Sequence, residues 1–150
     1  MGRFAAAVLA ALLLAPAAAK PSTVVRVLQE FDLFGAWASD CDGDASPANP
    51  HVSVTMSAPG EVLEQHDFGL GYEPNRYRIL SARRLDKERL QVETLFEQEG
   101  AEPQRQRIIM RFEDGRRRTI FTAPKGEEPR VLNGIAIASG APTPQLRKCD

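Results

Sequence analysis

The sequence predicts an all-β protein, an eight-stranded antiparallel up-and-down β-barrel with a short N-terminal helix closing one end. Three observations carry this prediction. Eight short β-rich segments follow one another, and mostly hairpin-length turns join them. A single helical pattern precedes the first segment. The only two cysteines, Cys41 and Cys149, lie near the two ends of the series, as expected if the first strand meets the tail.

Residues 1–19 have the pattern of a secretory signal peptide. Arg3 supplies the positive n-region, an apolar run follows from Phe4 to Leu14, and Ala17 to Ala19 supply the small residues of a cleavage site. The apolar run is shorter than the roughly 20 residues of a membrane-spanning helix. The expected product is one exported domain over 20–150, soluble in the periplasm or outside the cell, with no transmembrane segment.

The charges nearly balance, with 19 Lys and Arg against 20 Asp and Glu, so nothing in the composition favours nucleic acid as a partner. In an oxidising compartment, two cysteines this far apart favour a disulfide between Cys41 and Cys149 over a metal site. Asp40, Asp42 and Asp44 cluster, but the glutamate that completes a calcium-binding loop does not follow. A solvated loop is expected there, and no metal or cofactor is expected in the protein.

The helix is predicted to begin after Ser22, a good N-cap residue, and to end at Gly35, a natural C′ residue. Its apolar residues recur at helical spacing and are Val24, Val27, Leu28, Phe31 and Phe34. A helix this short needs a surface on which to bury its apolar side, and one end of the sheet is the expected surface.

Eight strands are predicted after the helix. They cover 36–41, 51–57, 61–68, 76–83, 89–97, 105–113, 116–122 and 130–138. Asp114-Gly115 is the strongest hairpin signal in the chain. A two-residue turn at this point pairs, on one face, Phe112 with Arg117, Met110 with Thr119, and Ile108 with Phe121.

A meander of eight strands has two free edges, and closing it into a barrel removes both. Eight strands leave an interior that is filled by side chains or holds one small ligand. A bond between the two cysteines would tie the first strand to the tail, as closure requires. A two-sheet sandwich is the alternative architecture.

The segment from Phe31 to Trp37 resembles the opening motif of the lipocalin and calycin family, in which a short helix closes one barrel end and Gly-x-Trp starts the first strand. The resemblance gives Gly35 and Trp37 structural roles, with the tryptophan packed across the closed end. It also implies that Cys149 is the tail cysteine of the family's disulfide. The family's late arginine, which packs over the tryptophan, could correspond to Arg130. The family's Thr-Asp-Tyr motif is missing, and the loops are shorter than is typical.

The residues favour binding over catalysis. Neither His51 nor His66 lies in a nucleophile motif, and the chain contains no glycine-rich phosphate loop, so no catalytic residue is assigned. The expected function is that of a non-enzymatic exported protein whose lipocalin-like barrel binds a small apolar or amphipathic molecule. The alternative is an interaction protein with a packed interior, either a secreted protease-inhibitor-like barrel or an envelope protein with a protein partner.

The candidate ligand-binding residues lie on the face that Arg117 shares with Phe112, Met110 and Phe121. If this face is interior, the Arg117 guanidinium needs an anion, and a ligand carboxylate at the barrel mouth is one candidate. Tyr77 could add a hydroxyl to the same group. The competing interpretation is that the arginines between 105 and 118 form a solvated outer face.

Overall fold

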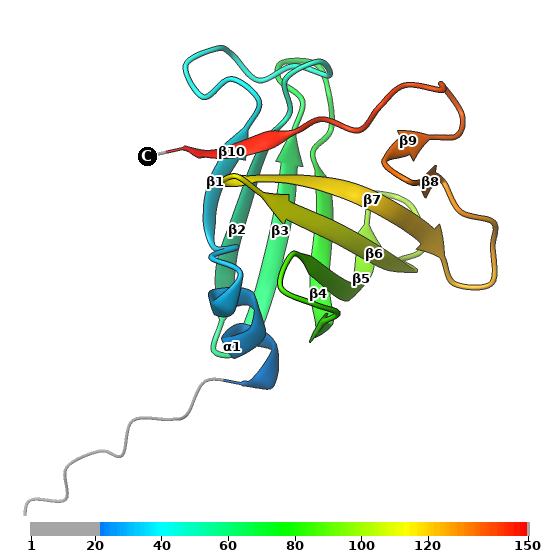
Figure 1. Cartoon of the computed structure of the whole chain (residues 1–150). Coiled ribbons are helices and arrows are strands. Elements are labelled where there is room, and N and C mark those ends of the chain that lie inside the picture. The colour runs from blue at the N-terminus through cyan, green and yellow to red at the C-terminus, as the bar shows by residue number, and fades with distance from the viewer. Residues whose placement is uncertain (1–21, 150) are drawn as a thin grey trace, which may run out of the picture.

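The computed structural model describes residues 22–149, in which ten strands form one antiparallel sheet that closes on itself. Strands β1 to β7 form a meander, and β10 pairs with both β1 and β7, which completes a barrel of eight strands (Figure 1). The elements are α1 Thr23–Glu30, β1 Gly35–Ala38, β2 His51–Ala58, β3 Glu61–Asp67, β4 Asn75–Arg84, β5 Arg89–Glu97, β6 Gln104–Glu113, β7 Arg116–Pro124, β8 Val131–Leu132, β9 Ile135–Ala136 and β10 Leu146–Cys149. The predicted signal peptide, 1–19, lies outside the described residues.

The closed barrel confirms the predicted fold class and excludes the two-sheet sandwich. It is compatible with a lipocalin-like fold. The barrel closes because β10 lies between the first and seventh strands, where Trp37 pairs with Lys148 and Leu146 pairs with Arg117. The predicted Cys41–Cys149 disulfide is present just beyond these pairs, and it joins cysteines with a sequence separation of 108.

The prediction of a final strand over 130–138 is wrong. Asn133 and Gly134 have positive φ angles of 52° and 75°, and they form a tight turn that breaks this segment into the β8–β9 hairpin. Asn-Gly is a favoured pair for such turns. The hairpin extends the sheet beyond β7, and the strand that closes the barrel is formed instead by the tail after Pro144.

Helix α1 covers one end of the barrel and begins at the predicted N-cap, where the Val25 amide donates to Ser22 Oγ at 3.3 Å (Figure 1). The prediction that it ends at Gly35 is wrong. The chain leaves the helix at Phe31, and Asp32, with φ 49°, takes the left-handed position that follows. Gly35 begins β1 with φ 116°, and an added Cβ there would lie 3.2 Å from Lys148 Cε. Among residues 22–149 no helix is both long and apolar enough to cross a membrane.

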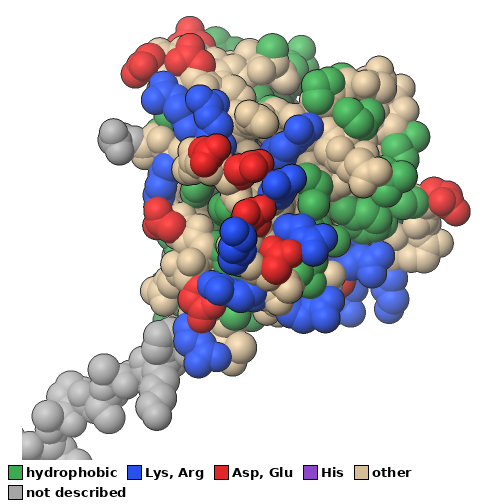
Figure 2. Space-filling view, viewed as in Figure 1, with side chains coloured by type: hydrophobic (Ala, Val, Ile, Leu, Met, Phe, Trp, Pro, Cys, Tyr) green, Lys and Arg blue, Asp and Glu red, His purple; other side chains and the backbone are tan. Residues whose placement is uncertain are grey.

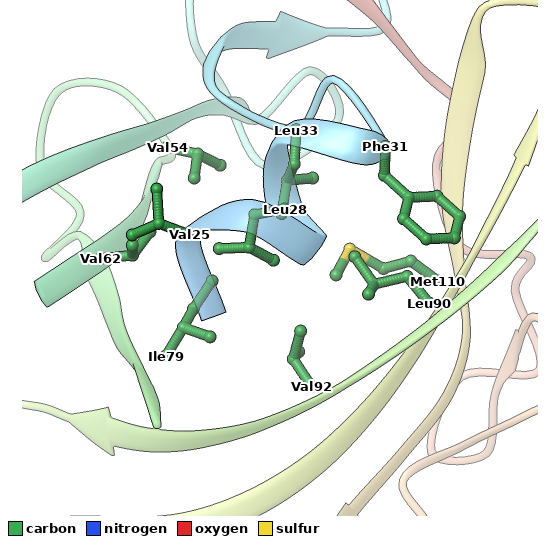
Figure 3. Packing of buried hydrophobic residues seen from close by; sticks show 10 residues of the cluster. All are labelled: Val25, Leu28, Phe31, Leu33, Val54, Val62, Ile79, Leu90, Val92 and Met110. Atoms are coloured by element: carbon green, nitrogen blue, oxygen red, sulfur yellow. The ribbon is translucent and has the colours of Figure 1, made fainter. Parts of the chain in front are cut away.

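The main apolar core lies between α1 and the barrel interior. Val25 and Leu28 point from the helix into the interior, toward side chains of β2 to β6 (Figure 3). The buried members of this cluster are Val25, Leu28, Phe31, Leu33, Val54, Val62, Ile79, Leu90, Val92 and Met110. Trp37 lies beside this cluster and donates its indole N–H to the Leu33 carbonyl oxygen at 2.8 Å. The helix end of the barrel is therefore packed with apolar side chains.

The β6–β7 hairpin places Arg117 inside the barrel. The predicted pairs of Phe112 with Arg117 and Met110 with Thr119 are confirmed. The predicted partner of Phe121 is wrong, because a bulge after Thr119 shifts the register and sets Phe121 opposite Ile109. Phe121 lies against the Arg107 side chain, whose Cζ is 5.0 Å from the ring centroid.

Candidate ligand-binding site

A cavity of about 270 Å³ lies between the start of β2, the end of β3 and the middle of β7. The loop that precedes β2 and the tail that precedes β10 complete its walls. Its lining residues are Pro47, Pro50, Val52, Glu64, His66, Phe68, Met110, Arg117, Arg118, Thr119, Thr122, Val131, Thr143, Pro144 and Leu146. We call this cavity the mouth pocket. Apolar side chains from five separate segments form most of its wall, and a small group of ionisable side chains enters it from β3 and β7.

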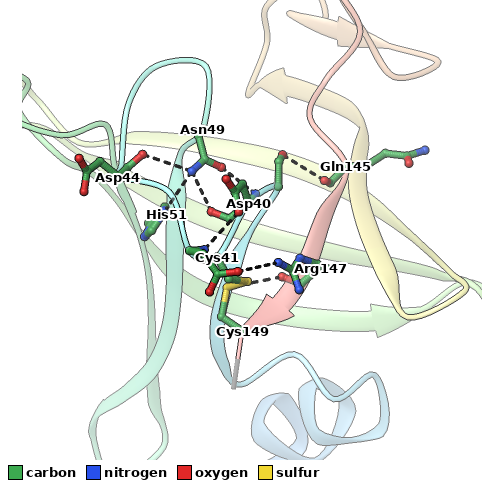
Figure 4. The surroundings of a disulfide bond; sticks show 10 residues. Asp40, Cys41, Asp44, Asn49, His51, Gln145, Arg147 and Cys149 are labelled. Carbon is green, nitrogen blue, oxygen red and sulfur yellow. Dashed lines mark hydrogen bonds and ion pairs between the residues drawn. A yellow bond between two sulfur atoms is a disulfide. The ribbon is translucent and has the colours of Figure 1, made fainter.

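Asn49 organises the loop that contributes Pro47 and Pro50 to the mouth pocket. Its side-chain amide accepts from the Asp40 amide at 2.9 Å and donates to the carbonyl oxygens of Asp40 and Asp44 at 2.9 and 3.2 Å (Figure 4). The Cys41–Cys149 disulfide ties the start of the same loop to the tail. The loop is thus held by one local network, and one covalent bond links it to the end of β10.

A buried ion pair crosses the barrel interior beside the pocket. Arg117 Nη1 donates to Glu64 Oε2 at 3.0 Å, and His66 Nε2 lies 2.7 Å from Glu64 Oε1. Only 3% of Arg117 and 9% of Glu64 are exposed. Burial raises the pKa of Glu64, but the Arg117 charge and the contact with His66 outweigh it and bring the pKa from 4.5 down to about 2. Glu64 is therefore an anion at physiological pH.

The Arg117 guanidinium also packs on the only tryptophan. Its Cζ lies 5.0 Å from the centroid of the Trp37 ring, within the range of a cation–π contact. The resemblance to lipocalins suggested Arg130 for this position. The structure instead places Arg130 on the surface, where it pairs with Glu127 at 3.3 Å. In the sequence, the feature that pointed to Arg117 was its predicted pairing with Phe112 across the β6–β7 hairpin.

Two of the three guanidinium nitrogens of Arg117 lack a hydrogen-bond partner. Nη1 contacts Glu64 and lies 3.2 Å from Met110 Sδ, a weak acceptor. Nε and Nη2 are buried, and neither has a partner among the described residues. Buried donors normally have partners, so this edge of the guanidinium is an unusual feature of the site.

Tyr77 packs against His66 and so lies beside the group formed by Arg117, Glu64 and His66. The centroids of the Tyr77 and His66 rings are 4.9 Å apart, and Tyr77 stacks on Phe96 at 5.0 Å. Burial, with the nearby Glu64 charge, raises the pKa of Tyr77 to about 12. Its hydroxyl therefore stays protonated at physiological pH, with the Asn75 side-chain amide 3.4 Å away as a donor.

The sequence-predicted ligand residues separate into three groups. Arg117 and Met110 line the mouth pocket, and Tyr77 contacts its wall through His66. Phe112 lies at the helix end of the barrel, between the rings of Phe31 and Trp37 at 5.1 and 6.4 Å. Phe121 is on the outer side of β7.

Sequence reasoning weighed Glu64 and His66 only as catalytic groups and did not place them in the ligand site. Val62 is buried on β3, and the two-residue period of a strand places residues 64 and 66 on the same face. That signal could have predicted an interior carboxylate, the anion that Arg117 requires.

No protein-family model, curated protein or solved structure matches the chain. The arrangement itself offers apolar walls for the body of a small molecule and a few polar groups that could fix its orientation. This combination is typical of small-molecule binding sites.

Proposed function

We propose that the chain is an exported, non-enzymatic binding protein whose lipocalin-like barrel holds a small amphipathic molecule in the mouth pocket. The observation that carries this proposal is the cavity of about 270 Å³, with apolar walls and the buried Arg117–Glu64 pair, which His66 contacts, beside them. Ligand cavities are usually about 300 to 1,000 Å³ in volume, so the ligand is small.

The position of the pocket supports this function. α1 and its apolar core fill the opposite end of the barrel, so a ligand enters between the loop around Pro47 and the tail around Pro144. Arg117 also links the pocket to Trp37. A ligand that displaces the guanidinium by a fraction of an ångström should therefore change the fluorescence of the only tryptophan.

The test is native mass spectrometry of the mature protein purified from its natural source. It compares the wild type with a variant in which a larger side chain fills the pocket and with a control variant. Thr122 lines the cavity, whereas Thr55 is exposed on β2. The wild-type protein and Thr55→Phe should carry the same small molecule, and Thr122→Phe should have lost it. A wild-type protein without a bound molecule, or a molecule retained by Thr122→Phe, contradicts the proposal.

A second candidate function, protein interaction, has one specific observation in its favour. Ile109, Phe121, Leu132 and Ile135 are successive cross-strand neighbours in β6 to β9. Leu132 and Ile135 are 48% and 40% exposed, and apolar side chains gather over β8 and β9 in Figure 2. A partner protein that co-purifies with the wild type but not with Leu132→Ser/Ile135→Ser would favour this function.

A further inference from the structure

The unpartnered edge of Arg117 has the geometry of a hydrogen-bonding subsite. Nε–H and one N–H of Nη2 point in nearly the same direction along one side of the planar guanidinium. Neither nitrogen has a partner among residues 22–149, and 97% of the residue's surface is covered. An oxygen atom placed against this edge could accept from both donors.

Glu64 already balances the charge of Arg117. Its carboxylate lies 3.0 Å from the guanidinium, and Lys148, the other cation near Trp37, is paired with Asp32. Arg118 also lines the mouth pocket, but it lies on the opposite face of β7 and donates to the Gly134 carbonyl oxygen and to Thr143 Oγ1. A second anion beside Arg117 would leave excess negative charge in a buried site and would lose its hydration. An uncharged acceptor satisfies the same two donors without that cost.

Met110 packs against the remaining nitrogen of the Arg117 guanidinium, and both residues line the mouth pocket. The Met110 Sδ is 3.2 Å from Nη1. A methionine side chain has three rotatable bonds and can move without a change of backbone. A ligand that moves Met110 aside would therefore contact the Arg117 guanidinium.

We infer that the ligand of the mouth pocket carries an uncharged oxygen acceptor, a ketone, ester or amide carbonyl, that accepts from Nε and Nη2 of Arg117. This inference rests on the proposed function, and it replaces the ligand carboxylate that the sequence suggested. The anion that Arg117 requires is Glu64, from its own chain.

The test compares three probes of nearly equal size by ¹⁵N-resolved NMR of the full mature protein. The probes are cyclohexyl methyl ketone, isopropenylcyclohexane, in which CH₂ replaces the oxygen, and cyclohexanecarboxylate. The ketone should bind about tenfold more tightly than the hydrocarbon, the effect of one or two net hydrogen bonds. It should also bind more tightly than the carboxylate, and it should shift the Arg117 Nε–H signal.

Two variants test the role of charge. Glu64→Gln removes the counter-ion of Arg117, so the preference should reverse in favour of the carboxylate. Arg117→Met/Glu64→Gln removes the donors and both charges together, so the ketone should bind no better than the hydrocarbon. The Trp37 indole N–H signal reports whether each variant keeps the folded barrel, because that group donates to Leu33.

Each remaining outcome contradicts a different statement. Tighter wild-type binding of the carboxylate than of the ketone overturns the uncharged acceptor. Equal binding of all three probes overturns the polar subsite and leaves the proposed function standing. A spectrum in which no probe shifts the signals of pocket residues contradicts the proposed function itself.

Discussion

Glu64 is the buried side chain that balances the charge of Arg117 inside the barrel. The Arg117 and His66 contacts in turn keep the Glu64 carboxylate charged. The period of β3 makes its inward orientation predictable. Its pairing with Arg117, 53 positions away, depends on closure of the barrel and could not be predicted from local sequence.

The low pKa of Glu64 predicts acid sensitivity. Its folded-state value of about 2 lies below the ordinary 4.5, so the unfolded chain takes up the proton first as the pH falls. The stabilisation is full above pH 4.5 and is lost as the pH falls toward 2, by about 3 kcal/mol in total. Urea unfolding across this range should show a smaller pH dependence in Arg117→Met/Glu64→Gln than in the wild type. Equal pH dependence of the two proteins would contradict the assignment.

The raised pKa of Tyr77 predicts a second pH effect. The chain has two tyrosines, so Tyr72→Phe leaves Tyr77 as the only phenol that titrates. Ultraviolet absorbance should show its ionisation near pH 12 instead of the ordinary 10. The protonated Tyr77 hydroxyl contributes fully to the stability of the folded state below pH 10, and this contribution is lost as the pH rises through 12. A midpoint near 10 in protein that circular dichroism shows to be folded would refute the half-buried position of Tyr77 beside Glu64.

At the scale of elements, regular strands were easier to predict than the irregularities within them. The alternation of apolar and polar residues in β2 and β5, together with the Asp114-Gly115 turn, indicated a meander of strands. Asn133-Gly134 carried an equally clear turn signal, and its hairpin could have been recognised. The bulge after Thr119 had no comparable signal, because nothing in the composition of β7 indicates where an extra residue is accommodated.

The loop contact at Gly69 gives a prediction with a matched control. A Cβ at Gly69 would lie 2.2 Å from the Ala45 carbonyl oxygen, whereas Gly71 has nothing within 4 Å. Both glycines have φ near +85°, so alanine costs each about 1 kcal/mol in backbone conformation. Gly69→Ala should lose more stability than Gly71→Ala and should bind the ketone probe more weakly, because the loop that carries Pro47 must move. Equal unfolding free energies and affinities in the two variants would show that this contact does not hold the pocket.

The whole molecule is a barrel whose closing strand and disulfide lie at the same seam. The number of strands and the positions of the cysteines predicted closure correctly. They did not predict which segment closes the barrel, because Leu146–Cys149 is too short and too polar to stand out as a strand. Its place depends on hydrogen bonds to two strands that are distant in sequence.

Removal of the disulfide should weaken the molecule without opening the barrel. Loss of a cross-link across 108 positions costs about 4 to 5 kcal/mol in the chain-entropy description. Cys41→Ser/Cys149→Ser should show this loss in urea unfolding and should keep the β-sheet circular dichroism spectrum, because β10 still pairs with β1 and β7. Reduced wild-type protein serves as the control and should match the variant. Unchanged stability would mean that the bond does not restrain the unfolded chain.

A crystal structure of protein purified from its natural source would show whether the mouth pocket holds a small molecule. The expected result is electron density for a compact molecule between β2, β3 and β7, with an uncharged oxygen against Nε and Nη2 of Arg117. Side chains that close over this space, in protein that carries no bound molecule by mass spectrometry, would contradict the proposed function.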